Sequence, residues 1–208
     1  EVNLTRSESR EQAFMLLFSK SFDDEPLEET IDDNSEMFVG GVCAYAQAVV
    51  SGIEDKREEI DEIIASHLKK GWTLSRISKP SLAILRLAIY EMKYLDNVPQ
   101  SVSINEAVEL ANDSNLGLTG SVWSKNMGKA KKLARRVRAG AVTVNDHLMS
   151  HALAETQWGG FKETGIGRTH GKLGFDEMTQ PQVIVNDILF FAKKNLWWHP
   201  YSQTAYEG

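Results

Sequence analysis

Cys43 is the side chain best suited to nucleophilic chemistry, and it lies in the small-residue segment 40–44. A cysteine after a pair of glycines could present a thiolate to an electrophile if a general base stood close by. No base motif accompanies it. Residues 38–53 are apolar on nearly every side, which favours a small thiol buried on a tightly packed helix. As the only cysteine, Cys43 excludes an internal disulfide and indicates a reducing compartment.

Two further patterns could hold a ligand, and both have simpler interpretations. Gly165 and Gly167 are spaced as in a dinucleotide loop, but their segment lacks the strand and helix that such a loop connects. Four histidines share no ligand spacing and have no cysteine partners, namely His147, His151, His170 and His199. The sequence therefore predicts no catalytic residue, no metal site and no cofactor site.

A basic segment offers a different chemistry. Residues 125–138 contain no acid and carry seven cations, namely Lys125, Lys129, Lys131, Lys132, Arg135, Arg136 and Arg138. Such a segment could bind RNA or another anion. A solvated helix face is the interpretation favoured by composition alone.

Charge divides the 208 residues into two parts. Up to Ala111 there are 11 basic and 21 acidic residues, a formal charge of −10, and from Asn112 onward 12 basic and 8 acidic residues give +4. This asymmetry predicts two domains, residues 1–111 and 112–208. Neither a signal peptide nor an apolar run of bilayer length is evident, so we expect a cytoplasmic protein with no membrane partner.

The elements of the first part are expected to be helices. Helical periodicity predicts helices over residues 9–18, 38–53, 60–68 and 81–94, with a loop or short helix over the acidic residues 23–36 and a turn over 96–99. Ser103 and Glu106 have the spacing of a capping box, which predicts a further helix beginning at Ser103. The first part is therefore predicted to be an all-α bundle.

The second part mixes strands and helices. We expect strands over residues 118–123, 141–145 and 182–185, a helix over 125–138, and a loop over 150–174. A short helix over 189–196 and an extended end from Trp197 complete the prediction. Met127, Leu133 and Val137 form an apolar stripe that should pack on the first part or on the two neighbouring strands.

Residues 9–18, 76–92 and 98–111 resemble the NusB family of transcription antitermination factors, over roughly residues 4–111. The resemblance implies a helical domain that binds boxA-like RNA beside a small-subunit ribosomal protein. It assigns RNA contacts to Arg6 and Arg10, with Phe18 and Lys20 as additions, through phosphate contact and base stacking. The family's closing helix has no match, so the apolar faces around Leu85, Ile89 and Val108 are expected to be partly open.

Residues 111–123, 139–146, 158–168 and 179–185 resemble the carboxyl-terminal part of NAD(P)-dependent aldehyde dehydrogenases, over about residues 105–208. The resemblance implies an incomplete α/β fragment of the catalytic domain, with a strand used for contacts in a homo-oligomer. In that family the catalytic cysteine, the glutamate and the nucleotide-binding motif lie upstream, and none has a match in this sequence. We therefore expect no enzyme activity and no cofactor.

Residues 105–111 fit either family, so the chain is interpreted as a fusion of two incomplete domains. The leading hypothesis is an RNA-binding antitermination domain joined to a non-catalytic fragment. One alternative is an oligomerising remnant of an aldehyde dehydrogenase. The other is a chimeric product with no selected function.

Overall fold

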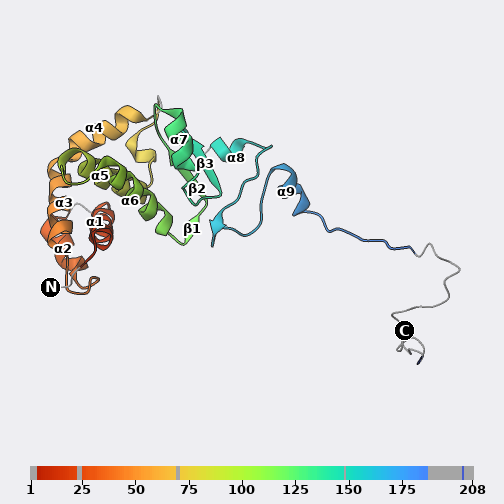
Figure 1. Ribbon diagram of the computed structural model, residues 1–208, viewed down its shortest axis with the longest axis horizontal. Coiled ribbons are helices and arrows are strands. Elements are labelled where there is room, and N and C mark those ends of the chain that lie inside the picture. Colours follow the sequence, from red (N-terminus) through yellow and green to blue (C-terminus); the bar gives the residue numbers. More distant parts are fainter. Residues whose placement is uncertain (1–3, 23–24, 69–70, 148, 187–202, 204–208) are drawn as a thin grey trace. The chain divides into compact units, whose positions relative to one another are not determined.

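The computed structural model describes residues 4–22, 25–68, 71–147, 149–186 and 203. The chain divides into two compact units, Glu1–Glu177 and Met178–Gly208. All the helices and strands named below belong to the first unit (Figure 1). Among the helices of the described ranges, none combines the length and apolar character that crossing a membrane requires.

The amino-terminal part of the first unit is helical, as predicted. Its elements are α1 (Arg6–Lys20), α2 (Leu27–Ser35), α3 (Ala44–Asp55), α4 (Arg57–His67), the short 3-10 helix η1 (Leu74–Arg76), α5 (Lys79–Tyr94) and α6 (Gln100–Asp113). Of the two structures expected for the acidic stretch 23–36, the short helix is observed as α2. The turn expected at 96–99 separates α5 from α6.

The helix α1 begins three residues earlier than the sequence pattern suggested. Thr5 is its N-cap, and a capping box joins Thr5 to Glu8: the Thr5 hydroxyl accepts from the Glu8 amide at 3.2 Å, and the Thr5 amide donates to Glu8 Oε2 at 2.7 Å. The earlier start places Arg6 in the first turn and Arg10 in the second.

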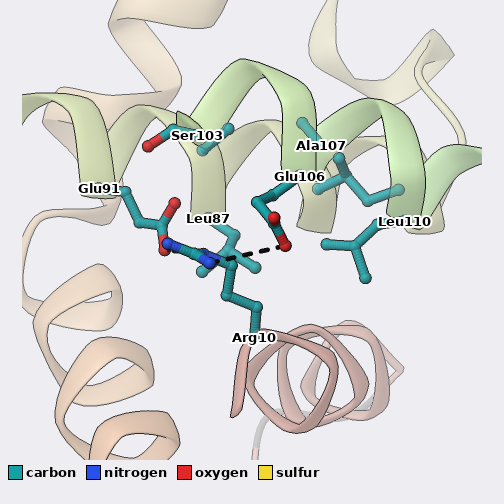
Figure 2. Close-up of a pocket in the computed structure, with 9 residues that line it drawn as sticks. Arg10, Leu87, Glu91, Ser103, Glu106, Ala107 and Leu110 are labelled. Carbon is teal, nitrogen blue, oxygen red and sulfur yellow. Dashed lines mark hydrogen bonds and ion pairs between the residues drawn. The ribbon is translucent and has the colours of Figure 1, made fainter. Parts of the chain in front are cut away.

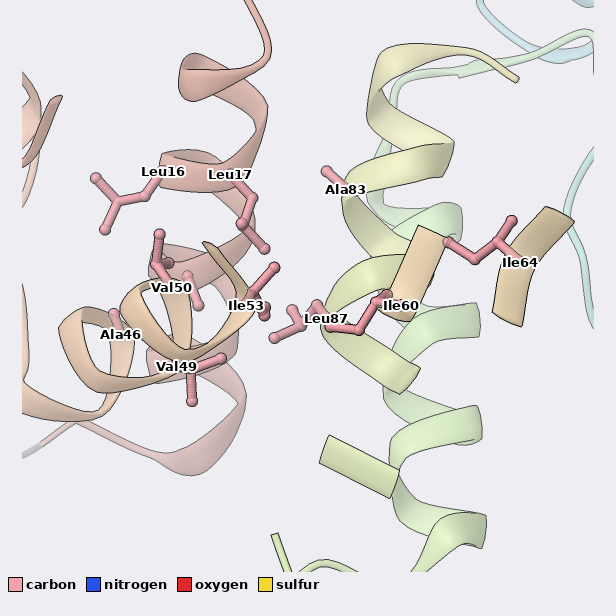
Figure 3. Close-up of a cluster of buried hydrophobic side chains, with 11 residues drawn as sticks. Leu16, Leu17, Ala46, Val49, Val50, Ile53, Ile60, Ile64, Ala83 and Leu87 are labelled. Atoms are coloured by element: carbon pink, nitrogen blue, oxygen red, sulfur yellow. The ribbon is translucent and has the colours of Figure 1, made fainter. Parts of the chain in front are cut away.

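A core of apolar side chains holds the bundle together (Figure 3). It combines one stripe from each of α1, α3, α4 and α5, which is how amphipathic helices remove their apolar faces from water. Its fully or nearly fully buried members are Ala13, Leu16, Leu17, Ala46, Val49, Val50, Ile53, Ile60, Ile64, Ala83 and Leu87.

The central helix is shorter than the apolar run 38–53 predicted. It begins at Ala44 because Gly40 and Gly41 adopt positive φ angles of 87° and 78°, which an α-helix does not contain. Val39 is 85% exposed, although Phe38 and Val42 are partly buried against the core. Cys43 is the N-cap of α3, half-buried, and not an internal residue of a buried helix.

The prediction that Ser103 caps a helix was wrong. The helix α6 begins at Gln100, directly after Pro99, so Ser103 is an internal residue with 1% of its surface exposed. The preceding helix α5 is capped by Ser78 and has Pro80 in its first turn, where a missing N–H costs nothing.

The apolar side chains expected to be open differ in their exposed fractions. Leu85 on α5 is 36% exposed and Ile104 on α6 is 39% exposed. Ile89 is half-buried and packs against the core, whereas Val108 is 6% exposed. Of the three residues expected to be open, only Leu85 is thus exposed.

Two small sheets follow α6. The strands are β1 (Leu116–Gly117), β2 (Thr119–Val122), β3 (Ala141–Val144) and β4 (Phe161–Lys162), and α7 (Met127–Ala134) connects β2 to β3. β2 and β3 are parallel, with Thr119 opposite Ala141 and Val122 opposite Val144, while β1 pairs with β4 in antiparallel orientation. The two strands predicted around residues 118–145 are therefore adjacent in one sheet.

The predicted helix 125–138 is confirmed in its central eight residues as α7, which packs on β2 and β3. Ala130 is 1% exposed on its inner side. Val137 lies over Gly120, where an added Cβ would come within 2.8 Å of the valine Cγ1. Of the two surfaces considered for the apolar stripe, the neighbouring strands are the one observed for α7, but Met127 is 47% exposed and so is not buried there as expected.

The predictions for the remaining residues need two corrections. Residues 150–174 are not wholly loop, because they include most of α8 (Met149–Ala152), β4 and the start of α9 (Gly171–Asp176). Residues 182–185 do not form the expected strand: they lack a ladder partner among the described residues, and Val183, Ile184 and Val185 are at least 75% exposed. The predictions for 189–196 and from Trp197 onward lie outside the described residues.

Candidate functional site

Arg10 is the centre of a buried network of charged side chains. It lies on the inner face of α1, one turn after Arg6, and only 5% of its surface is exposed. Its Nε donates to Glu91 Oε1 at 2.5 Å, and its Nη1 lies 3.5 Å from Glu106 Oε2. Figure 2 shows the guanidinium between the two carboxylates, which come from α5 and α6.

Two hydroxyl groups complete this network. The Tyr45 hydroxyl on α3 donates to Glu91 Oε1, and the Ser7 hydroxyl on α1 donates to Glu106 Oε2 at 3.1 Å. Four helices are thereby joined through polar contacts, in addition to the apolar core. A satisfied buried network of this kind specifies how helices pack, because a slipped helix would leave a charge unpaired.

The electrostatics follow from this arrangement. Burial raises the pKa of the Tyr45 phenol, and the hydrogen bond to Glu91 raises it further, since both disfavour the phenolate. For Arg10, burial opposes the charged form, but the hydrogen bond and the negative charge of Glu91 outweigh it and raise the pKa. Arg10 therefore stays cationic, and its guanidinium faces the carboxylates inside the bundle.

The four residues assigned to RNA contact lie in three different settings. Arg6 is exposed at the start of α1, with its guanidinium carbon 5.4 Å from the centre of the Tyr45 ring. Lys20 is the last residue of α1, about 21 Å farther along the helix axis, and donates to the Glu25 carbonyl. Arg10 is buried between them, so the structure brings together Arg6 and Arg10 but not Lys20.

Phe18 belongs to an aromatic row on another side of α1. Its ring is stacked with Phe14, with ring centres 6.1 Å apart, and meets Phe22 edge-on at 5.0 Å. The ammonium of Lys79 lies over the Phe22 ring at 3.8 Å. Phe18 is half-buried and packs against the core, so much of its surface is already in contact with protein.

The sequence analysis did not single out Tyr45, Glu91 or Glu106 as part of the site. A signal for Glu91 exists in the sequence, because it follows Leu87 and Ala88 by four and three residues and so occupies an inward position of α5. A carboxylate on the apolar stripe requires a buried cationic partner. No comparable signal identifies Arg10 as that partner, since the two residues are 81 positions apart.

A groove of about 250 Å³ lies beside this network. Its lining includes four carboxylates and one cation, and consists of Ser7, Glu11, Glu106, Glu109, Leu110, Asn112, Asp113 and Arg138. The excess of negative charge repels phosphate. The groove is therefore unsuited to binding a phosphate group.

Cys43 lies apart from any catalytic arrangement in the described residues. Its backbone N–H donates to Gln12 Oε1 at 2.9 Å, and its sulfur accepts from the Ala46 amide at 3.4 Å. These contacts fix the start of α3 against α1. Nowhere in the described ranges do three or more histidine, cysteine, aspartate or glutamate side chains gather as they would around a metal ion.

These features define the class of protein: an all-α bundle whose first helix begins with an arginine and is anchored by a buried ion network, continued by a small α/β segment. The chain belongs to the NusB family, whose model matches residues 7–116. The model of the aldehyde dehydrogenase family matches residues 96–184, so the two matches overlap around α6.

Curated relatives support the NusB assignment over most of their own length. The transcription antitermination protein NusB of Limosilactobacillus reuteri is 35% identical over 135 residues, which cover 63% of this chain and 96% of the relative. The corresponding protein of Acetivibrio thermocellus is 42% identical over 130 residues, covering 62% and 89%. A NusB-like domain therefore forms the amino-terminal part.

Solved structures resemble the other part. Betaine aldehyde dehydrogenase from Staphylococcus aureus is 42% identical over 39% of this chain and 18% of its own, with a TM-score of 0.34. An aldehyde dehydrogenase from Mycobacterium tuberculosis is 36% identical over 36% of this chain and 15% of its own, also at 0.34. The chain spans less than a fifth of the length of these enzymes.

Proposed function

We propose that the chain is an RNA-binding antitermination protein whose RNA contact is centred on the start of α1. The observation that supports this proposal is the combination of NusB family membership with the position of Arg6, which is exposed in the first turn of α1 above the Tyr45 ring. An exposed guanidinium beside an aromatic ring can contact a phosphate while a base stacks nearby. The proposed partners are boxA-like RNA and a small-subunit ribosomal protein.

Within this proposal the four predicted residues have different roles. Arg6 contacts phosphate directly. Arg10 acts as a positioning residue, because its ion pairs with Glu91 and Glu106 hold α1 at the angle that presents Arg6. Lys20 and Phe18 extend the contact toward the other end of α1, which requires an RNA segment of several nucleotides.

The proposal includes a domain boundary and a role for the second domain. Residues 1–111 bind RNA, and residues 112–208 are a non-catalytic aldehyde dehydrogenase fragment. Support for the second statement is that the only thiol, Cys43, lies in the first domain as a helix cap. A protein that acts on nascent RNA must reside where transcription occurs, so the proposal places it in the cytoplasm.

The test is titration of labelled boxA RNA with the full chain, beside a scrambled RNA of the same length. We expect boxA to bind more tightly, and Arg6→Ala to weaken binding to both RNAs by removing one phosphate contact. Arg57→Ala is the matched control, since Arg57 is an arginine of α4 whose side chain is 41% exposed and pairs with Glu54. Equal affinities of Arg6→Ala and Arg57→Ala would refute the α1 assignment.

The absence of aldehyde oxidation is tested separately. NAD or NADP reduction with short aliphatic aldehydes should equal the buffer blank, because among the described residues Cys43 contacts Gln12 and Ala46 and no group that could act as a base. A turnover signal that disappears in Cys43→Ser would contradict the proposal.

A further inference from the structure

The segment from Ser124 to Gly140 concentrates positive charge to a degree unique in this chain. It contains seven lysines and arginines and no acid, a formal charge of +7 in a protein of net charge −6. All seven side chains are exposed. The segment forms α7 and its two flanks (Figure 1).

The stability of α7 does not explain where the cations lie along this segment. Cations near the end of a helix are favourable because they oppose the partial negative charge of the last carbonyl groups, which accounts for Lys131 and Lys132. The same dipole makes a cation in the first turn unfavourable. Lys129 nevertheless occupies the third position of α7, and Lys125 lies just before the N-cap Asn126. The positive charge at this end therefore opposes helix formation.

The cations on the outer side of α7 are directed away from its packed face. Ala130 marks the inner side with 1% exposure, and Lys132 and Arg135 follow it by two and five positions, which is about 200° and 140° around the helix. Arg136 is directed instead toward α6, where its Nη1 donates to Asn105 Oδ1 at 2.6 Å and its Nη2 lies 3.8 Å from Glu109.

An aromatic cluster lies at the amino-terminal end of this basic segment. The Trp123 ring, three residues before the cap of α7, lies 5.9 Å from the Trp72 ring. The His147 ring meets Trp72 edge-on at 5.7 Å, and the Arg76 guanidinium lies 5.4 Å from the centre of the Trp72 ring. Both tryptophans are half-buried, so each retains an accessible part of its ring.

We infer that the outer face of α7, with the Trp72–Trp123 pair at its end, is a second RNA contact of this protein. Lys132 and Arg135 neutralise phosphates, and an unpaired base stacks on the exposed part of the tryptophan pair. The aromatic rings favour single-stranded RNA over an acidic peptide, which would use the cations but not the rings. This inference rests on the proposed function as an RNA-binding protein, but it concerns a separate face and an interaction without sequence preference.

The first test measures the salt dependence of binding. The full chain is titrated with an unstructured RNA lacking boxA across a salt series, and compared with Lys132→Ala/Arg135→Ala. Loss of two phosphate contacts to a single strand should lower the slope of log affinity against log salt by about 1.4. Arg57→Ala/Lys172→Ala removes the same charges from α4 and α9 and should leave the slope unchanged.

The second test examines stacking. Trp123→Ala should weaken binding of the same RNA roughly tenfold, while Trp123→Phe, which keeps an aromatic ring, should retain most of the affinity. Thermal unfolding of each variant establishes that it is folded at the titration temperature. If Trp123→Ala is unfolded at that temperature, the quenching of tryptophan fluorescence by RNA in Trp123→Phe is measured in place of the affinity of Trp123→Ala.

The outcomes separate this inference from the proposed function. If boxA is not preferred and Arg6→Ala has no effect, but the α7 variant lowers the slope, the proposed function fails and the inference stands. An α7 variant whose slope equals that of its control overturns the inference, whatever happens at Arg6. Displacement of RNA by polyglutamate at equal charge concentration would overturn it in favour of an acidic protein partner.

Discussion

Arg86 and Asp61 form a two-point ion pair that joins α5 to α4. Arg86 Nε donates to Asp61 Oδ1 at 2.8 Å, and its Nη2 donates to Oδ2 at 2.7 Å. The side chains are 11% and 21% exposed, so water screens the pair only in part. Parallel hydrogen bonds between a guanidinium and a carboxylate also fix the relative orientation of the two helices.

Arg86→Ala should destabilise the protein, because it leaves the carboxylate of Asp61 half-buried without its partner. We expect a loss of about 1–3 kcal/mol in the free energy of unfolding, measured with urea. Arg57→Ala removes an arginine whose side chain is 41% exposed from its pair with Glu54 within three residues, and should cost at most about 0.5 kcal/mol. Equal losses of unfolding free energy in Arg86→Ala and Arg57→Ala would contradict the conclusion that Arg86–Asp61 is the more strongly stabilising pair.

Gly52→Ala should destabilise the protein although alanine is the better helix former. Gly52 lies inside α3, and a Cβ there would come within 2.0 Å of the Tyr90 hydroxyl oxygen and 2.5 Å of the ring carbon that carries it. Forcing the ring aside should cost about 1–3 kcal/mol. Gly128→Ala in α7, where the new Cβ would lie 3.4 Å from the side-chain oxygen of Asn126, should be neutral or stabilise by up to about 1 kcal/mol. Stabilisation by Gly52→Ala would show that Tyr90 moves freely.

The raised pKa of Tyr45 predicts a loss of stability at alkaline pH. Since the folded phenol keeps its proton above the ordinary value of 10.0, the folded state binds more protons than the unfolded state from pH 10 upward. The contribution of the Tyr45 phenol to the free energy of unfolding should therefore be complete below pH 10 and be lost as the pH rises beyond that value. The free energy of unfolding of Tyr45→Phe should fall less steeply over the same range, and identical slopes would refute the buried contact with Glu91.

The capping box of α1 predicts an effect of opposite sign at acidic pH. Hydrogen bonds from the Thr5 hydroxyl and the Thr5 amide hold the pKa of Glu8 below its ordinary value of 4.5. The contribution of this carboxylate to stability is therefore complete above pH 4.5 and is lost as the pH falls through the lowered pKa. Thr5→Ala removes the hydroxyl but keeps the backbone amide, so it should weaken that dependence, and it should cost about 1 kcal/mol at neutral pH through loss of the cap. An unchanged acid profile in Thr5→Ala would contradict the prediction.

Comparison of two capping patterns shows how far the sequence could predict the fold. Thr5 with Glu8 and Ser103 with Glu106 have the same spacing, yet the first is a capping box and the second lies inside a helix. The difference comes from Pro99, which starts α6 four residues before Ser103. Periodicity found the longer helices and the β2–β3 pair because their apolar residues repeat regularly, but it missed the short helices α8 and α9. Helix ends depend on such competing neighbours.

The sequence predicted less of the candidate site than of the fold. The basic character of the start of α1 is visible in Arg6 and Arg10, but their different exposure depends on Glu91, which is distant in the chain. Residues 182–185 illustrate the same limit for strands. Their composition is that of a strand, but a strand requires a partner, and among the described residues none pairs with them.

The parallel pair β2–β3 and the helix α7 that covers it have a consequence for how the chain acquires its structure. The four residue pairs of this ladder join Thr119–Val122 to Ala141–Val144, and the flanking backbone hydrogen bonds involve Leu118 and Asn145. The pair therefore takes no strand from the helical bundle, and we expect a change upstream of Leu118 to leave the four residue pairs in place. We therefore expect β2, α7 and β3 to keep their structure when the helical bundle changes, and hydrogen exchange at β3 should be insensitive to substitutions in α1.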